Sequence, residues 1–220
     1  MKLSEIKNKL NPELYEIISK EFSELRPSQE KAIKAGLLEG KNLLVCSPTA
    51  SGKTLIAEIA AMQNIMNGKG KAIYIVPLKA LATEKFKDFK KKYPKIKTTL
   101  SIGDFDSDDS YLQNYDLIIS TSEKMDSLIR HKAPWFKYVH TIIVDEVHLL
   151  NDVGRGPTLE ILLTILRRLL RKSQIIALSA TIGNPKELAK WLNANLVSDN
   201  WRPVKLKKGV YLDGEIEFPE

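Results

Sequence analysis

Apolar residues recur along the chain in short runs that are rich in Val and Ile, and each run ends in small or polar residues. The runs are hydrophobic almost throughout, without the alternation that is typical of a half-exposed strand. This pattern indicates strands that are buried on both faces, as in a parallel sheet. The predicted strands are residues 42–46, 71–76, 98–102, 116–120, 141–144 and 175–178.

Segments with the 3.6-residue period of a helix lie between these runs. The predicted helices are residues 29–39, 52–67, 80–92, 122–130, 159–171 and 185–192, preceded by an amphipathic helix at about residues 12–22. Alternating strands and helices predict an α/β fold, a doubly wound and mainly parallel sheet flanked by helices.

Composition narrows the class of protein without identifying it. The chain has 220 residues, 43% of them hydrophobic, and no apolar run of membrane-spanning length. It carries a net charge of +7, which favours an anionic partner. Its single cysteine, Cys46, excludes a disulfide framework. A cytoplasmic protein with no membrane partner is therefore expected.

The first predicted strand runs directly into Ser47-Pro48-Thr49-Ala50-Ser51-Gly52-Lys53-Thr54, which matches the phosphate-loop pattern except that Ser47 stands at the first glycine. Backbone N–H groups of such a turn bind phosphate oxygens. Lys53 would add a charge between the outer phosphates, and Thr54 would offer its hydroxyl to Mg²⁺. The competing interpretation is a Ser- and Gly-rich turn with an incidental lysine. The candidate nucleotide-binding residues in the loop are Thr49, Ala50, Ser51, Gly52, Lys53 and Thr54.

Two adjacent carboxylates, Asp145 and Glu146, follow the fifth predicted strand. Such a pair is costly at a buried strand end unless a cation compensates it. We expect Asp145 to hold Mg²⁺ through water and Glu146 to activate the attacking water, with Lys53 as a third catalytic residue. An exposed acidic turn is the alternative. His148, two residues further on, is a candidate because of its position.

Together these motifs resemble the first RecA-like domain of a superfamily 2 DExH-box helicase, over about residues 25–203. Asp145-Glu146-Val147-His148 resembles the DExH box, Leu25-Arg26-Pro27-Ser28-Gln29 a Q-type motif, Pro77-Leu78-Lys79-Ala80-Leu81 motif Ia, Thr121-Ser122-Glu123-Lys124 motif Ib, and Ser179-Ala180-Thr181 motif III. They occur in the order that this superfamily shows.

Four further segments resemble the archaeal Holliday-junction-migration helicases, which are related to the Ski family and unwind forked DNA with 3′-to-5′ polarity. They are Gly103-Asp104-Phe105-Asp106, Asn114-Tyr115-Asp116, Gly154-Arg155-Gly156-Pro157-Thr158-Leu159-Glu160 and Asn200-Trp201-Arg202-Pro203-Val204. The resemblance implies roles in DNA repair and recombination.

The resemblance also implies roles for single residues. Gln29 would recognise adenine, although it could simply be a polar residue that opens a helix. His148, Ser179 and Thr181 would couple the ATP site to nucleic acid, the alternative being local capping. The candidate nucleic-acid contacts are Lys79, Thr121, Ser122, Lys124 and Arg155, each of which could equally be a solvated surface residue.

We therefore expect an N-terminal helical segment at residues 1–24, a RecA-like domain at 25–200, and an exit segment at 201–220 that leads toward a second RecA-like domain outside this sequence. The predicted function is the motor domain of an ATP-dependent DNA helicase, using ATP and Mg²⁺, monomeric, and bound to single-stranded or forked DNA. Two alternatives stay open. One is an RNA helicase of the same superfamily, and the other is a nucleotide-dependent nucleic-acid-binding module without turnover.

Overall fold

A computed structural model describes residues 1–103, 109–204, 209–212 and 214–218. Its centre is a seven-stranded sheet in which every neighbouring pair of strands is parallel. The strand order is β3-β4-β2-β5-β6-β1-β7. The strands are β1 (Leu43–Cys46), β2 (Lys71–Val76), β3 (Thr98–Ser101), β4 (Leu117–Thr121), β5 (Val139–Val144), β6 (Gln174–Ser179) and β7 (Asn195–Ser198).

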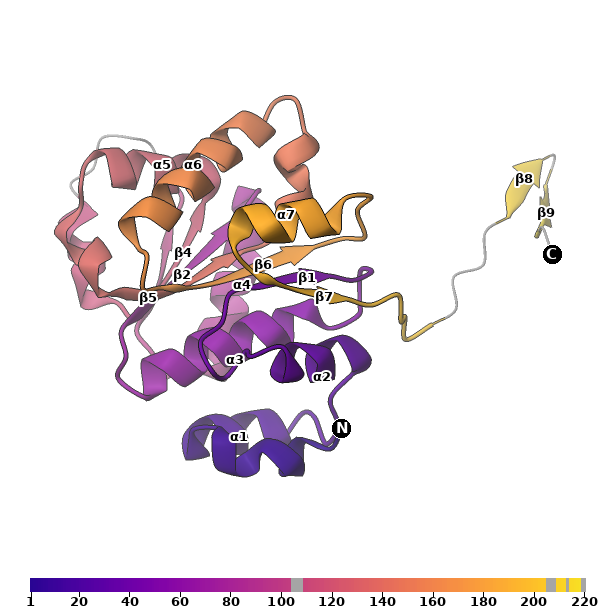
Figure 1. The fold of residues 1–220 in the computed structure, drawn as a ribbon, viewed down its shortest axis with the longest axis horizontal. Helices are drawn as coiled ribbons and strands as arrows, with labels where there is room; N and C mark the ends of the chain where they lie inside the picture. Colours follow the sequence, from indigo (N-terminus) through magenta and orange to yellow (C-terminus); the bar gives the residue numbers. More distant parts are fainter. Residues whose placement is uncertain (104–108, 205–208, 213, 219–220) are drawn as a thin grey trace.

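Helices cover both faces of this sheet, which confirms the predicted doubly wound α/β fold (Figure 1). One face packs against α2 (Pro27–Lys34), α3 (Lys53–Met66) and α4 (Lys79–Lys92), and α1 (Pro12–Ser19) packs on α3, away from the sheet. The other face packs against α5 (Ser122–Arg130), α6 (Gly156–Leu169) and α7 (Pro185–Leu192). Short 3₁₀ helices span Leu3–Lys9, Asp109–Asn114, Pro134–Tyr138 and Val147–Asn151.

The helix expected at residues 29–39 is shorter and begins earlier than predicted. Pro27 opens α2, as proline often does at a first helical position. The helix ends at Lys34 because Gly36 adopts a left-handed φ of +102°. The amide of Leu37 then donates to the carbonyl of Ala32, a bond that satisfies a free carbonyl at the helix end.

Several elements were not predicted. The 3₁₀ helix at Leu3–Lys9 precedes α1, and β7 forms the sheet edge next to β1 with only one fully buried residue, Val197. Edge strands carry more polar residues, so their apolar signal is weak. Two short strands, β8 (Val210–Leu212) and β9 (Glu215–Glu217), pair in an antiparallel hairpin that lies apart from the main sheet (Figure 1). Asp104, Phe105 and Asp106, which contributed to the family resemblance, lie outside the described residues.

Hydrogen bonds and an ion pair connect the N-terminal segment to α3 and α4. Gln63 of α3 accepts a hydrogen bond from the amide of Asn11 at 2.8 Å and donates one to the carbonyl of Lys9 at 3.0 Å. Lys92 of α4 forms an ion pair with Glu21 at 2.6 Å. The first 24 residues therefore form one packed body with α3 and α4. No helix in the described part of the chain has both the length and the apolar character needed to cross a membrane.

Candidate active site

The segments singled out in the sequence meet at the carboxyl edge of the sheet. The phosphate-loop sequence follows β1, the acidic pair follows β5, and Ser179 ends β6, which lies between those two strands. Crevices at the carboxyl ends of parallel strands are the usual ligand sites of such folds. The topology thus brings together residues more than 130 positions apart in sequence, from Ser47 to Ser179.

The loop after β1 has the backbone of a phosphate cradle. Ala50 and Gly52 adopt left-handed φ angles of +65° and +90°, and α3 begins at Lys53. The φ of +90° would strain any other residue at Gly52, and a Cβ there would lie 2.4 Å from the Gln29 amide nitrogen, so Gln29 would have to move. The Lys53 ammonium donates to the carbonyl of Ser47 at 2.7 Å. The lysine therefore lies across the loop that would hold phosphate.

Ser47, which replaces the usual first glycine, is accommodated without distortion. Its side chain is buried, and its hydroxyl lies 2.8 Å from the hydroxyl of Ser51 across the loop. The serine thus closes the turn with a hydrogen bond that a glycine could not make. Its amide donates to the carbonyl of Ser179 at 3.2 Å, which fixes the loop to β6.

Helix α2 holds the phosphate loop from outside. The Gln29 amide nitrogen donates to the carbonyl of Gly52 at 3.0 Å, while its oxygen accepts from the amide of Arg26 at 2.8 Å. The Arg26 guanidinium donates to the carbonyl of Ala50 at 2.7 Å. Gln29 therefore supports the loop in this conformation. Sequence reasoning missed Arg26, although it lies within the motif that pointed to Gln29.

A buried tyrosine orients the first carboxylate of the acidic pair. Tyr74 of β2 donates its hydroxyl hydrogen bond to Asp145 Oδ2 at 3.0 Å, and Asp145 Oδ1 accepts from the amide of Glu146 at 3.0 Å. Burial, together with the Asp145 charge, raises the pKa of Tyr74 well above its ordinary value, so the phenol stays a donor. Tyr74 was missed because a tyrosine in an apolar strand is an ordinary core residue.

Glu146 occupies a strained backbone position beside this aspartate. Its φ is +54°, a left-handed conformation that residues other than glycine rarely adopt. Strain of this kind costs about 1–3 kcal/mol and is concentrated at functional sites. The conformation separates the Glu146 side chain from that of Asp145 and leaves it partly exposed.

The lysine and the two carboxylates act on one another electrostatically. Burial lowers the pKa of Lys53, and the charges of Glu146 and Asp145 oppose this shift. The structure thus brings the predicted catalytic residues Lys53, Asp145 and Glu146 together.

His148 lies between the acidic pair and the end of β6. Its Nδ1 accepts a hydrogen bond from the amide of Ala180 at 3.2 Å and lies 3.2 Å from Glu146 Oε2. Ser179 is buried, and its hydroxyl has no hydrogen-bond partner among the described residues. Thr181 is exposed. Of the three expected coupling residues, His148 therefore makes a direct contact between the acidic pair and the Ser179-Ala180-Thr181 segment.

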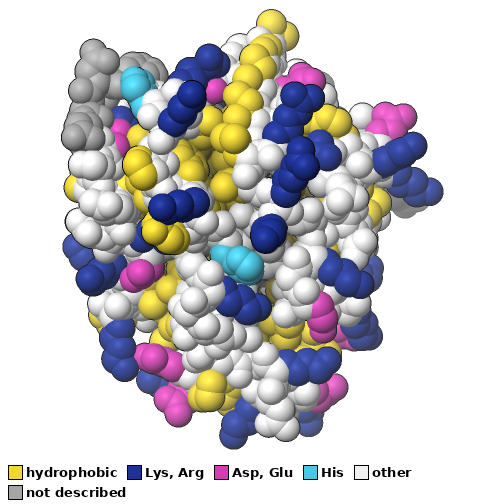
Figure 2. Space-filling model, turned by 60° about the vertical axis from the view of Figure 1, so that its left-hand side comes forward, with side chains coloured by type: hydrophobic (Ala, Val, Ile, Leu, Met, Phe, Trp, Pro, Cys, Tyr) yellow, Lys and Arg dark blue, Asp and Glu magenta, His cyan; other side chains and the backbone are white. Residues whose placement is uncertain are grey.

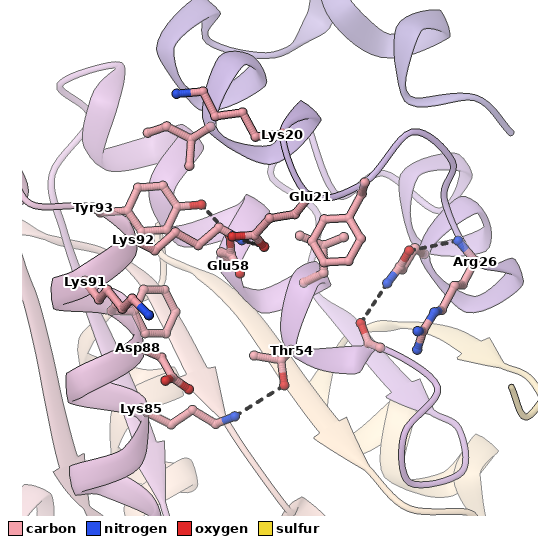
Figure 3. A pocket seen from close by; sticks show the side chains of 16 residues that line it. Lys20, Glu21, Arg26, Thr54, Glu58, Lys85, Asp88, Lys91, Lys92 and Tyr93 are labelled. Carbon is pink, nitrogen blue, oxygen red and sulfur yellow. Dashed lines mark hydrogen bonds and ion pairs between the residues drawn. The ribbon is translucent and has the colours of Figure 1, made fainter.

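A cavity of about 650 Å³ opens beside the phosphate loop, between α1, α3 and α4 (Figure 3). Gln29, Gly52 and Thr54 line one side of it. On the opposite side, Glu58 accepts a hydrogen bond from Tyr93 and pairs with Lys92 at 2.8 Å. Apolar side chains also line the cavity, among them Phe22, Leu55 and Phe89, so its wall combines apolar and charged groups.

Lys85 also reaches into this cavity, where its ammonium lies 3.4 Å from the Thr54 hydroxyl (Figure 3). Lys85, Lys91 and Lys92 all belong to α4, a lysine-rich helix, and all three line the cavity.

Thr54 and Asp145 have the donor atoms that Mg²⁺ prefers. Magnesium takes hard oxygen ligands and usually keeps several waters, with one or two protein ligands and substrate phosphates. Each Asp145 oxygen accepts one hydrogen bond and retains further lone pairs. The Thr54 hydroxyl and the Asp145 carboxylate are thus suitable types of ligand for Mg²⁺.

The expected nucleic-acid contacts fall into two groups. Lys79, at the start of α4, and Arg155 are exposed. Thr121 and Ser122 are buried at the start of α5, where the Thr121 hydroxyl caps the helix by accepting from the amide of Lys124. Asp152 Oδ1 accepts hydrogen bonds from the amides of Gly154 and Arg155 and so shapes the loop that presents Arg155.

Lys124 was expected to contact nucleic acid, but its side chain is buried and paired. Its ammonium forms an ion pair with Asp109 at 2.7 Å, and both side chains are more than 90% buried. A buried, paired ammonium presents no charge to a phosphate, so the direct contact expected of Lys124 is corrected to a structural role at α5.

Basic side chains do not gather in one patch on the face drawn in Figure 2. Lysine and arginine side chains are scattered across it, with acidic side chains among them. On this face the positive charge is therefore spread rather than concentrated.

Comparison with known proteins places the chain in a family. The DEAD/DEAH box helicase family matches residues 26–188, and the chain belongs to this family. It is 50% identical over 216 residues to the ATP-dependent DNA helicase Hel308 of Pyrococcus horikoshii, a match covering 97% of this chain and 30% of the relative. It is 55% identical over 211 residues to Hel308 of Methanocaldococcus jannaschii, covering 91% and 17%.

A solved structure of the DUF1998 helicase MrfA, bound to DNA and AMPPNP, is also similar. The TM-score is 0.77 at 26% identity, covering 87% of this chain and 29% of that one. These relatives confirm the resemblance to superfamily 2 and its archaeal branch, and membership of the family implies nucleotide binding. The chain spans less than a third of the length of each of these relatives.

Proposed function

We propose that the carboxyl edge of the sheet binds Mg²⁺-ATP and hydrolyses it, and that this chain is the first RecA-like domain of a DNA helicase. The observation that carries the proposal is the convergence of Lys53, Asp145 and Glu146 around a preformed phosphate loop. Each has the chemistry that phosphoryl transfer to water requires, which is charge neutralisation, metal binding and a base.

The phosphates would lie in the loop formed by Thr49, Ala50, Ser51 and Gly52. Their arrival would draw the Lys53 ammonium from the Ser47 carbonyl onto phosphate oxygens. Gln29 lines the adjoining cavity, which supports its role as an adenine contact.

Thr54 and Asp145 would hold Mg²⁺, Asp145 through water. The ion, when bound, neutralises charge that develops on the phosphates. Glu146 would accept a proton from the attacking water, and Tyr74 would keep Asp145 in one orientation. His148 would communicate the state of Glu146 to Ser179 and Thr181 through the Ala180 amide.

The parent protein would translocate on single-stranded or forked DNA with 3′-to-5′ polarity. Its relatives are named ATP-dependent DNA helicases, and unwinding needs two domains whose grips on DNA move relative to each other. We divide the chain into an N-terminal segment at 1–24, the RecA-like domain at 25–200 and an exit segment from residue 201. We also propose that the protein acts as a monomer in the cytoplasm.

Contacts with DNA would be made to phosphates by Lys79, Arg155 and the start of α5 at Thr121 and Ser122. Helix N-termini and exposed cations bind backbone rather than bases, as a translocating protein requires. Because such contacts discriminate poorly between DNA and RNA, an RNA helicase remains the second candidate.

The test is phosphate release by the parent protein with single-stranded DNA, with RNA and without polymer. The proposal predicts Mg²⁺-dependent hydrolysis that DNA stimulates more than RNA does. Stronger stimulation by RNA would favour the RNA helicase, and no hydrolysis would favour a binding module. Residues 1–220 alone should bind nucleotide, hydrolyse it very slowly and unwind no duplex.

A further inference from the structure

Arg26 contacts two segments that are far apart in the sequence. Its guanidinium donates to the carbonyl of Ala50 in the phosphate loop at 2.7 Å. The same guanidinium lies over the ring of Trp201, 5.5 Å from the ring centroid. Trp201 is the first residue of the exit segment, so one side chain contacts both the phosphate loop and the chain that leaves the domain.

The phosphate-loop end of this contact lies at a residue of the loop that would bind phosphate. Ala50 is held in a left-handed conformation, with φ of +65°, that alanine rarely adopts. The Arg26 hydrogen bond to the Ala50 carbonyl stabilises the loop backbone in this conformation. Phosphate oxygens that bind the loop amides would therefore act on the same short segment of backbone that Arg26 holds.

At the other end of the contact, the backbone beside Trp201 is held by hydrogen bonds and an ion pair that do not involve Arg26. Asp199 pairs with Lys31 of α2 at 2.8 Å, and its carboxylate accepts from the amide of Trp201 at 2.6 Å. The amide of Asp199 also donates to the carbonyl of Cys46 at 3.0 Å, just before the phosphate loop. The backbone at Trp201 is thus fixed, while its ring is 38% exposed and rests on Arg26.

We propose that Arg26 is a positioning residue that links nucleotide occupancy of the phosphate loop to the exit segment through Trp201. This inference rests on the proposed nucleotide site. Coupling of this kind is reciprocal, so movement of the exit segment changes nucleotide affinity by the same factor by which nucleotide changes the segment. The position of the exit segment therefore alters the affinity of the site for nucleotide.

The first experiment measures ADP·Mg²⁺ binding to residues 1–220 by calorimetry, with Trp201→Ala and Trp201→Phe. An exposed cation–π contact corresponds to a factor of about two to five in an equilibrium constant. Trp201→Ala should therefore weaken ADP binding about two- to fivefold, because Arg26 is left less constrained. Trp201→Phe keeps an aromatic face and should restore most of that loss.

The second experiment reads the exit segment directly by tryptophan fluorescence. ADP should change the emission of the wild-type chain, and this change should be absent in Trp201→Phe, which keeps the other two tryptophans. Arg26→Gln should abolish the change, whereas Arg26→Lys should retain part of it. The matched control is Arg167→Gln, because Arg167 lies over Trp191 at 5.4 Å in a pair that does not touch the phosphate loop. This control should leave the ADP-induced change intact.

The outcomes distinguish a failure of the Arg26–Trp201 coupling from a failure of the proposed nucleotide site. ADP binding that depends on Lys53, with unchanged emission and unchanged affinity in Trp201→Ala, would overturn the coupling and leave the nucleotide site standing. No ADP binding by the wild-type chain would overturn both.

Discussion

The proposed nucleotide side and the proposed nucleic-acid side of the same sheet edge are built differently. On the nucleotide side, Arg26 and Gln29 hold the carbonyls of the phosphate loop, and Tyr74 holds Asp145. On the nucleic-acid side, Lys79 and Arg155 are exposed. Chemistry on a phosphate needs groups fixed in place. A polymer that must slide needs only charges that it can reach and leave. Mutations on the nucleotide side should therefore change ATP hydrolysis and its magnesium dependence. Mutations on the nucleic-acid side should change the affinity for DNA and its dependence on salt.

The largest effect is expected from Glu146→Gln in the parent protein. The amide keeps the size of the side chain but loses its basicity, and general base catalysis contributes about 10²–10⁴ in rate. ATP hydrolysis should fall by that factor while ATP binding is retained, as steady-state phosphate release and calorimetry would show. Glu160→Gln, on the exposed face of α6, is the control. Hydrolysis at the normal rate by Glu146→Gln would remove Glu146 as the base.

Lys124→Ala tests whether the lysine that resembles a DNA contact is structural. It removes one partner of a buried ion pair, which typically costs about 3–5 kcal/mol. The free energy of unfolding, measured in denaturant, should therefore fall by several kcal/mol. The control Arg130→Ala breaks a pair with Asp126 in which the arginine is exposed, and it should cost less than about 1 kcal/mol. A stable Lys124→Ala protein with weakened DNA binding would show instead that Lys124 contacts DNA.

Tyr74→Phe should have an intermediate effect that appears in the magnesium dependence. Removal of the hydroxyl frees Asp145 Oδ2, so the carboxylate samples orientations unsuited to the ion. The Mg²⁺ concentration for half-maximal ATP hydrolysis should rise about threefold to tenfold, since a hydrogen bond to a charged group is worth about 1.5–3 kcal/mol and part of it is recovered from water. The exposed Tyr138→Phe is the control. An unchanged magnesium titration would show that Asp145 needs no orienting partner.

The smallest effects should come from Lys79→Ala and Arg155→Ala. Each would remove one proposed phosphate contact, so the negative slope of log affinity against log salt on single strands should become shallower by about 0.7. The loss should be the same for different base sequences. Lys172→Ala, at the opposite edge of the sheet beside the start of β6, serves as the control. A loss that depends on base sequence would mean that these residues read bases.

Sequence patterns predicted the sheet well because every central strand is buried on both faces and reads as an apolar run. They failed at β7, which is a partly exposed edge strand, and at the end of α2, where the conformation of Gly36 decides the boundary. The phosphate loop and acidic pair were predictable because their residues are contiguous in sequence.

The supporting contacts were not predictable in the same way. Tyr74 and Asp145 are 71 residues apart and meet only because β2 and β5 are neighbours in the sheet. In the sequence Lys124 could not be distinguished from a surface cation, because its pairing with Asp109 is formed only by the tertiary structure. Local patterns identify which groups can do chemistry, whereas tertiary contacts decide which of them are held in place.

The central claim is that the loop at Gly52-Lys53-Thr54 binds the phosphates of Mg²⁺-ATP. The most direct test is a calorimetric titration of residues 1–220 with ATP and Mg²⁺, beside Lys53→Ala, whose fold is checked by circular dichroism. Hydrogen bonds to charged groups are worth about 1.5–3 kcal/mol, so affinity should fall at least about tenfold in Lys53→Ala. Equal ATP affinity in the wild-type chain and a folded Lys53→Ala protein would contradict the account.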